Sequence, residues 1–233
     1  MWRQNYQELL DPTTTIVRNA KRLQQLTEDI LDVAKIESQS LQLKKELLNV
    51  NEVILSVLAD YDSSSSSSSS SSNNNIQKVH NNGNNVRITF SSKDDLFVMA
   101  DRSRLYQVFA NLLNNAIKFT KEGSITIIVQ RNDTNNDDYN EDDYNVNKEA
   151  VVSIKDTGVD IDPEILPRLF SKFATKPETS GTGLGLFISK AIIEAHGVRM
   201  WTENNSDLVD NKEKRGAKFS FTLPLTIDKG TLK

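Results

Sequence analysis

Residues 101–120, D-R-S-R-L-Y-Q-V-F-A-N-L-L-N-N-A-I-K-F-T, constrain the fold more than any other part of this chain. At about 100° per residue they form a helix with two faces. The apolar face consists of Leu105, Phe109, Leu112, Leu113 and Ala116. The polar face consists of Arg104, Gln107, Asn111, Asn115 and Lys118. Asparagine is unfavourable inside a helix because its amide competes for backbone hydrogen bonds. The polar face is therefore either solvated, as most polar helix faces are, or it gathers amide oxygens and an ammonium around a metal-bound phosphate.

A glycine-rich turn at 181–186, G-T-G-L-G-L, favours the phosphate site. It opens onto an apolar helical pattern from Phe187 to Ala195. Glycine lets the backbone approach an anion, and amides at a helix start provide donors. Between the two stretches, an apolar run ends at Asp156 and is followed by the turn T-G-V-D-I. The turn at 181–186 lacks the G-K-[ST] of a Walker A loop and the last glycine of the dinucleotide fingerprint. No H-R-D or D-F-G follows it, so it does not match a serine/threonine kinase loop either.

In order and spacing, these three stretches resemble the N, G1 and G2 boxes of the ATP-binding catalytic domain of sensor histidine kinases, within the GHKL group. The sequence L-F-S-K-F at 169–173 is similar to the F box of the family. The resemblance implies an α+β fold of the Bergerat type. This fold is a two-layer α/β sandwich, in which helices cover one face of a mixed, largely antiparallel sheet.

The resemblance runs from about Val50 to Leu225, and we expect the ATP-binding domain to comprise residues 46–228. Two low-complexity inserts are expected within it, at 62–85 and 131–149. The first holds ten consecutive serines, which cannot bury apolar surface. The second is rich in Asp and Asn but lacks the glycine and terminal glutamate of an EF-hand.

The remaining patterns predict the other elements of the domain. We expect helices from Asn51 to Tyr61 and from Pro163 to Phe173, and a cap by Asp101 on the central helix. Strands are expected at 86–90, 96–99, 125–129, 150–155, 198–203 and 217–223. The polar turn between the first two strands predicts that they form a hairpin.

Residues 1–45 carry a different pattern. Asp11 and Pro12 favour a helix start at this point, with Asp as the cap. A heptad-like apolar seam follows, formed by Ile16, Leu23, Leu26, Ile30 and Val33. The seam can pack on the globular domain, but its length favours a helical bundle. Residues 23–38 look like the second helix of the dimerisation and phosphoacceptor hairpin of histidine kinases, followed by a connector.

The chain lacks the phosphoacceptor histidine that the family carries on the first helix of this hairpin. Its two histidines are His80, in a low-complexity segment, and His196, at a helix end. We therefore expect a truncated hairpin, with the acceptor histidine in a longer parent chain or in another kinase. Truncation is favoured because the N-terminal helix starts where the second hairpin helix would.

The resemblance assigns the nucleotide site to Asn111, Asn115, Lys118, Phe119, Asp156, Gly158, Ile161, Lys176, Gly181, Thr182, Gly183, Leu184 and Gly185. Asn115 matches the asparagine that holds Mg²⁺ between the phosphates, and Asn111 and Lys118 would contact phosphate oxygens. Asp156 would accept a hydrogen bond from the adenine amino group. Phe119 matches an aromatic position beside the nucleotide, and a core aromatic is nearly as plausible for it.

The glycines at 181, 183 and 185 would wrap the phosphates with their amides. A lid at 174–180 carries Lys176, which is either placed to reach the γ-phosphate or simply exposed. Asp160 departs from the family, which usually has glycine there. A carboxylate at this position alters the turn or weakens nucleotide binding.

The GHKL hydrolases carry a general-base glutamate where this chain has Asn111, and an amide cannot take a proton from water. The sequence thus predicts an ATP- and Mg²⁺-binding histidine kinase region that donates the γ-phosphate to a histidine outside this chain, with no catalytic nucleophile of its own. The expected partners are a phosphoacceptor domain, a response-regulator receiver domain and, in the parent protein, a second copy. A degenerate kinase that only binds partners and, less probable, a free-standing ATPase stay open as alternatives.

Composition excludes several other classes of protein. The net charge of −4 argues against a nucleic-acid binder driven by overall charge. The chain has no cysteine, so disulfides and thiolate chemistry are absent. No apolar run reaches the length of a membrane span or signal peptide. We therefore expect a cytoplasmic location, which leaves membrane attachment of a longer parent open.

Overall fold

The computed structural model of the chain describes residues 2–64, 86–132, 149–175, 181–205 and 215–226. Lys176, His80 and most of both predicted inserts lie outside these residues. The elements, in chain order, are α1 (Trp2–Glu37), β1 (Glu46–Asn49), α2 (Val50–Ser64), β2 (Val86–Ser92), β3 (Phe97–Ala100), α3 (Arg102–Phe119), β4 (Gly123–Asn132), β5 (Glu149–Asp156), the short 3-10 helix η1 (Leu166–Arg168), α4 (Gly185–Ala195), β6 (Met200–Asn204) and β7 (Ala217–Pro224).

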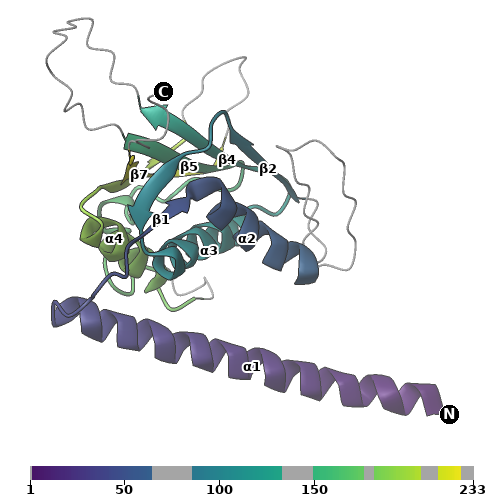
Figure 1. Cartoon of the computed structure of the whole chain (residues 1–233). Coiled ribbons are helices and arrows are strands. Elements are labelled where there is room, and N and C mark those ends of the chain that lie inside the picture. The colour runs from purple at the N-terminus through teal and green to yellow at the C-terminus, as the bar shows by residue number, and fades with distance from the viewer. Residues whose placement is uncertain (1, 65–85, 133–148, 176–180, 206–214, 227–233) are drawn as a thin grey trace, which may run out of the picture.

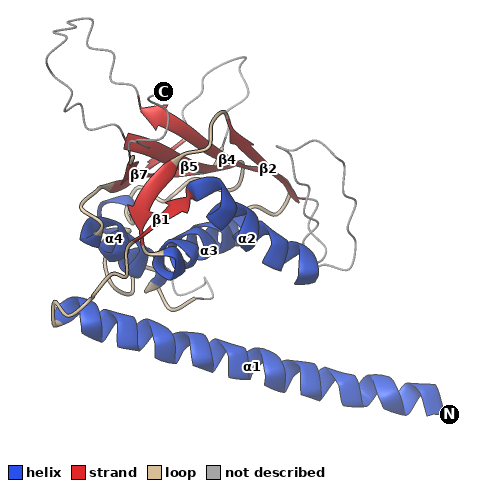
Figure 2. Cartoon of the chain, in the orientation of Figure 1, coloured by secondary structure: helices blue, strands red, loops and turns tan. Residues whose placement is uncertain are grey.

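A five-stranded sheet forms one layer of the domain, in the order β2-β4-β5-β7-β6. The β2–β4 pair is parallel and the other pairs are antiparallel. Figures 1 and 2 show that α2, α3 and α4 lie together on one side of this sheet, and that α1 runs beyond them as a separate long helix. The predicted two-layer α/β sandwich with a long N-terminal helix is therefore confirmed.

The core lies between the sheet and α3. Alternate residues of β4, such as Ile125 and Ile127, are buried, as the period of two in the sequence predicts. Leu105 and Phe109 of α3 are buried as well, and the ring of Phe109 lies 5.4 Å from that of Phe221 in β7. The apolar face of α3 thus packs on the sheet, which leaves its polar face on the opposite side.

The prediction that β2 and β3 form a hairpin is wrong. β2 pairs with β4, whereas β3 pairs with β1 in a separate two-stranded sheet. The turn between β2 and β3 is tied to the start of α2, because Asn51 donates to the carbonyl of Asp94 and Val50 N donates to Leu96 O. These bonds direct β3 away from β2 and towards β1.

Two helix predictions also need correction. α1 is helical from Trp2 and passes through Pro12, so the helix does not begin at Asp11. A proline within a helix removes one backbone hydrogen bond and can be accommodated at that cost. Between Pro163 and Phe173 only the 3-10 turn Leu166–Arg168 forms. Pro167 lacks the N–H that an α-helix would need there, and Phe173 has a positive φ of 61°.

The start of α3 is fixed from two sides. Asp101 caps the helix as predicted, because its side chain accepts a hydrogen bond from Arg104 N, and its other carboxylate oxygen accepts from Lys44 N. Asp101 N in turn donates to His196 Nε2 at 3.0 Å, beyond the end of α4. The second ring nitrogen of His196 lies 2.8 Å from Ile192 O, so the neutral ring satisfies both partners.

Burial lowers the pKa of His196 below its ordinary value of 6.5; the hydrogen bond with Ile192 O opposes this shift, the charge of Lys45 adds to it, and the charge of Asp101 opposes it. Below about pH 6.5 the unfolded chain therefore binds a proton that the folded protein resists. We expect the free energy of unfolding to fall as the pH drops from this value towards the lower pKa of the folded state. Below that pKa, His196 causes no further loss of stability.

The matched variant is His196→Gln, whose amide oxygen can still accept from Asp101 N but does not titrate. Urea unfolding of both proteins between about pH 7 and pH 5 measures the difference. We expect the wild type to lose more stability than the variant across this range. Equal pH slopes in the two proteins would show that His196 is not the titrating group.

Candidate functional site

A cavity of about 540 Å³ opens beside the polar face of α3. Small-molecule sites usually measure about 300–1,000 Å³. Most residues that the sequence assigned to a site line this cavity, namely Asn111, Asn115, Lys118, Phe119, Asp156, Ile161, Gly181, Thr182, Gly183 and Gly185. Residues 74 positions apart, such as Asn111 and Gly185, are in hydrogen-bond contact there. The structure therefore brings the N-box, G1 and G2 stretches to one place.

Three residues of the predicted set do not line this cavity in the described part of the chain. Gly158 lies against the end of α3, where a Cβ would come within 2.4 Å of Phe119 O. Leu184 belongs to the core, with 2% of its surface exposed. Lys176 lies outside the described residues.

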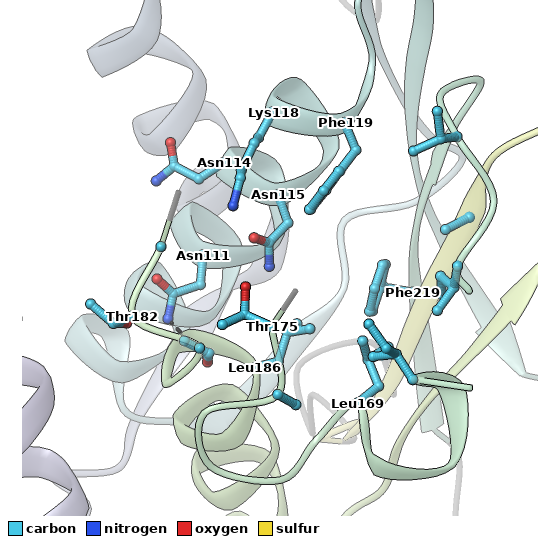
Figure 3. Close-up of a pocket in the computed structure, with 18 of the residues that line it drawn as sticks. Asn111, Asn114, Asn115, Lys118, Phe119, Leu169, Thr175, Thr182, Leu186 and Phe219 are labelled. Atoms are coloured by element: carbon cyan, nitrogen blue, oxygen red, sulfur yellow. Dashed lines mark hydrogen bonds between the residues drawn. The ribbon is translucent and has the colours of Figure 1, made fainter. Parts of the chain in front are cut away.

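The polar side chains of α3 make different contacts along the helix. Figure 3 shows Asn111, Asn115 and Lys118 pointing into a common space, with the ring of Phe119 beyond Asn115. Asn111 Nδ2 lies 3.4 Å from both Gly185 O and Ser189 Oγ, so it joins α3 to the first turn of α4. Asn114 also lines the cavity, but its Oδ1 accepts a hydrogen bond from Tyr61 in α2. Asn115 and Lys118 thus face the cavity from the C-terminal half of α3.

Lys118 lies at one end of the cavity in a cationic environment. Its ammonium sits 4.9 Å from the centre of the Phe119 ring, within range of a cation–π interaction. Burial lowers the pKa of Lys118, and the positive charge of Arg22 lowers it further. Positive charge is thus concentrated at this end of the cavity.

Asp156 lies at the end of β5, in a different wall of the same cavity. Its Oδ1 accepts hydrogen bonds from Gly158 N at 2.8 Å and from Ala217 N at 3.3 Å. Burial raises the pKa of this carboxyl, the two backbone donors oppose that shift, and the charge of Asp160 adds to it. The side chain is held by its Oδ1, which fixes the position of Oδ2.

Asp160, where the family usually has glycine, has a structural role. Its Oδ1 accepts a hydrogen bond from Gly216 N at 2.7 Å, which ties the turn after β5 to the start of β7. Gly216 has a φ of +117°, and a Cβ there would lie 2.2 Å from Asp156 O. The carboxylate therefore holds a close backbone crossing beside Asp156. The turn is thus ordered with Asp160 in place, and the effect of this carboxylate on nucleotide binding stays a prediction.

The glycine turn closes the cavity from the side of α4. Gly183 has a φ of +68°, and a Cβ there would lie 2.8 Å from the Cα of Phe173. Its carbonyl accepts from Phe173 N, which fastens the turn to the segment before the predicted lid. Thr182 Oγ1 accepts from Leu184 N and donates to Asp29 Oδ2 at 3.1 Å. Close backbone approach at this turn requires glycine.

The polar face of α3 also serves as a docking surface for α1. Arg104 Nη1 lies 2.8 Å from both carboxylate oxygens of Asp32, and Gln107 Nε2 donates to Asp32 Oδ2 at 2.8 Å. This half of the face is therefore bonded to another helix and is not solvated. Several apolar residues of the predicted seam point away from the domain, since Ile16, Leu23 and Ile30 are 67%, 65% and 55% exposed.

Sequence reasoning missed the wall that α1 contributes to the cavity. Arg22, Gln25 and Asp29 line it, together with Phe219 from β7 and Thr175. The three α1 residues follow each other at spacings of three and four, which places them on one helix face. That spacing was visible in the sequence, but nothing there indicated which element the face would meet.

The site offers few ligands for a metal ion. Within the described residues, no group of three or more His, Cys, Asp or Glu side chains is placed to hold a metal. A hard divalent ion in this cavity would therefore depend on amide oxygens such as that of Asn115 and on oxygens of its ligand.

Among the helices in the described part, none combines the length and apolarity needed to cross a membrane.

Comparisons with known proteins agree on the kind of domain. The family profile described as "Histidine kinase-, DNA gyrase B-, and HSP90-like ATPase" matches residues 100–227. The chain is 31% identical over 212 residues to the phytochrome-like protein Cph1 of Synechocystis sp.. It is 37% identical over 141 residues to the sensor protein FixL of Bradyrhizobium diazoefficiens. These alignments cover 90% and 60% of this chain but only 23% and 24% of the relatives. The chain thus spans about a quarter of their length.

Solved structures give the same picture. The catalytic domain of the histidine kinase ThkA superposes with a TM-score of 0.52 at 28% identity, covering 78% of this chain and 97% of that domain. Full-length ShkA in complex with AMPPNP superposes with a TM-score of 0.61 at 21% identity, covering 88% of this chain and 36% of ShkA. The second match supports the fold alone.

Proposed function

The chain belongs to the family of histidine kinase-, DNA gyrase B- and HSP90-like ATPases, and we propose that it is the ATP-binding catalytic region of a two-component sensor histidine kinase. It would transfer the γ-phosphate of ATP to a histidine outside this chain. The observation that carries the proposal is the convergence of Asn115, Asp156 and the glycine turn on one cavity of about 540 Å³. A location in the cytoplasm, where ATP is available, and a division of the chain near residue 46 both stay predictions.

The two ends of the cavity suit the two ends of a nucleotide. Asp156, Ile161 and Phe219 offer apolar surface beside a buried carboxylate, which fits a purine with an exocyclic amino group. Lys118 and the backbone of the glycine turn lie towards the other end, where a polyphosphate would find an ammonium and backbone amides. Phe119 lies between the two ends. Lys176 keeps its predicted role at the γ-phosphate as a proposal only.

The donor set fits a magnesium ion that travels with the nucleotide. Mg²⁺ takes few protein ligands and keeps waters and phosphate oxygens. Asn115 would hold it through its amide oxygen, and the absence of an acidic cluster in the described residues leaves no competing protein site. When bound, the ion would neutralise charge on the transferring phosphoryl group.

Asn111 favours transfer over hydrolysis. Its amide donates towards Gly185 O and Ser189 Oγ, so its role here is to position α4. An amide cannot accept a proton from water. Phosphoryl transfer needs positioning and charge neutralisation more than a base within the chain. The nucleophile would come from a phosphoacceptor domain of the parent protein or of another kinase, and a response-regulator receiver domain would take the phosphate from it. The parent protein would act as a homodimer.

The experiment has two steps. Calorimetry first measures ATP binding to the full chain with and without Mg²⁺, and we expect much tighter binding with the ion. A separately produced histidine-containing hairpin of a sensor kinase is then added, and acid-labile phosphate on the hairpin is the expected product. Binding without transfer would favour the degenerate, partner-binding alternative, and turnover without an acceptor would favour an ATPase. Failure to bind Mg-ATP would contradict the proposal.

A further inference from the structure

One wall of the nucleotide cavity comes from α1, outside the residues that the family profile matches. Arg22, Gln25 and Asp29 line the cavity from this helix. Each is one turn from the next, so a single face of α1 follows the opening of the cavity. Lys21, the neighbour of Arg22, is not among the lining residues.

Contacts along its C-terminal half fix α1 on the domain. Asp29 accepts from Thr182 in the glycine turn, and Asp32 is bonded to Arg104. The Arg104 and Asp32 side chains are only 21% and 9% exposed, so this pair is shielded from solvent. Glu37 forms an ion pair with Lys172, near the end of the helix. The placement of the α1 face therefore rests on bonds to three separate parts of the domain.

These contacts also set the direction of α1 relative to α3. Asp32 meets Arg104 and Gln107 near the start of α3, whereas Arg22 acts on Lys118 at its end. The two helices therefore run antiparallel across the site. This register puts the guanidinium of Arg22 at the end of the cavity where Lys118 lies, and about 10 Å along the helix axis from Asp29.

The charges at the two ends differ. Asp29 is 4% exposed, and its carboxylate is already engaged by Gln25 Nε2 at 2.9 Å and by Thr182. At the other end, Arg22 and Lys118 bring two like charges together, and the charge of Arg22 lowers the pKa of Lys118 in addition to the larger effect of burial. Repulsion between two cations is relieved when a polyanion lies between them. A guanidinium also suits phosphate, because its planar fork can bond two oxygens.

We propose that Arg22 is a phosphate-binding residue of the nucleotide site, supplied by α1 to the β- and γ-phosphates of a nucleoside triphosphate. The inference rests on the proposed function and deepens it. The helical segment is then part of the binding site and not only a connection to other domains. A nucleotide that lacks the outer phosphates does not reach Arg22.

The test compares three proteins and three nucleotides. Calorimetry measures the binding of Mg-ATP, Mg-ADP and AMP to the full-length wild type, Arg22→Gln and Lys21→Gln. Lys21→Gln is the matched control, because both variants lose one positive charge. We expect Arg22→Gln to weaken Mg-ATP binding about tenfold, since an exposed charged hydrogen bond lies at the low end of its range. Binding of AMP is expected to stay unchanged, and Lys21→Gln should match the wild type throughout. Arg22→Lys, which keeps the charge, should recover part of the loss.

Other outcomes separate this inference from the function on which it rests. If Arg22→Gln and Lys21→Gln bind Mg-ATP equally well, Arg22 is a solvated side chain and the inference is wrong, although the chain still binds ATP. If Arg22→Gln loses AMP and ATP binding alike, the residue acts through the shape of the cavity and the phosphate contact is disproved. If the wild type binds none of the nucleotides, the proposed function itself fails.

Discussion

Asn115→Ala is expected to lower the affinity for Mg-ATP by roughly 30- to 150-fold, which corresponds to the loss of about 2–3 kcal/mol from one charged oxygen contact. The side chain of Asn115 points into the cavity, and no acidic cluster among the described residues can replace it as a metal ligand. The affinity that remains should no longer depend on Mg²⁺. Calorimetric titration with ATP, in magnesium and in a chelator, measures both effects.

Asn114→Ala is the matched control for this variant. Asn114 is adjacent in α3 and has the same side chain, and it also lines the cavity, but its Oδ1 is already engaged by a hydrogen bond from Tyr61 in α2. We expect its removal to affect stability more than nucleotide affinity. Unchanged Mg-ATP affinity in Asn115→Ala would mean that the polar face of α3 serves only to pack the helices.

Asp156→Asn is expected to shift the ratio of ATP affinity to GTP affinity by about 100-fold towards GTP. The amide oxygen of the variant can still accept from Gly158 N and Ala217 N, so the fold is retained. Its amide nitrogen then takes the place of Oδ2, where a donor faces the amino group of adenine but matches the carbonyl of guanine. Competition binding with both nucleotides measures the ratio.

Asp160→Asn tests whether any loss of charge near the cavity has the same effect. Asp160 also lines the cavity, and its Oδ1 accepts a hydrogen bond from Gly216 N. The amide oxygen of an asparagine can accept the same hydrogen bond. We expect the ratio of ATP to GTP affinity to stay as in the wild type. The same ratio in both variants would show that Asp156 does not contact the base and instead supports the turn.

Much of the domain could be predicted because its signals are local. The two faces of α3, its cap at Asp101 and the alternation in β4 depend on residues that are close in sequence. The glycine turn is marked equally locally by its three glycines, and at Gly183 a Cβ would lie 2.8 Å from the Cα of Phe173. These signals sufficed to identify the fold and to gather most of the cavity.

Apart from the two local helix errors, the errors concern partners that are distant in sequence. β2 and β3 are separated by a turn that looks like a hairpin, yet the bond from Asn51 to Asp94 sends them to different sheets. His196 bonds to Asp101 across 95 positions, and no local pattern distinguishes it from an exposed histidine at a helix end. The carboxylates of α1 likewise gave no sign that their partners would be Arg104 and Thr182.

The hydrogen bond between Asp29 and Thr182 joins α1 to the glycine turn, so we expect the orientation of α1 and ligand binding in the cavity to be coupled. Turning this helix about its axis would pull the glycine turn away from α4 or break the bond. A ligand that needs the turn in place would therefore oppose such a rotation. Rotation of α1 would weaken binding of that ligand by the same coupling free energy. We therefore expect any rotation imposed on the long helix to change the affinity for nucleotide.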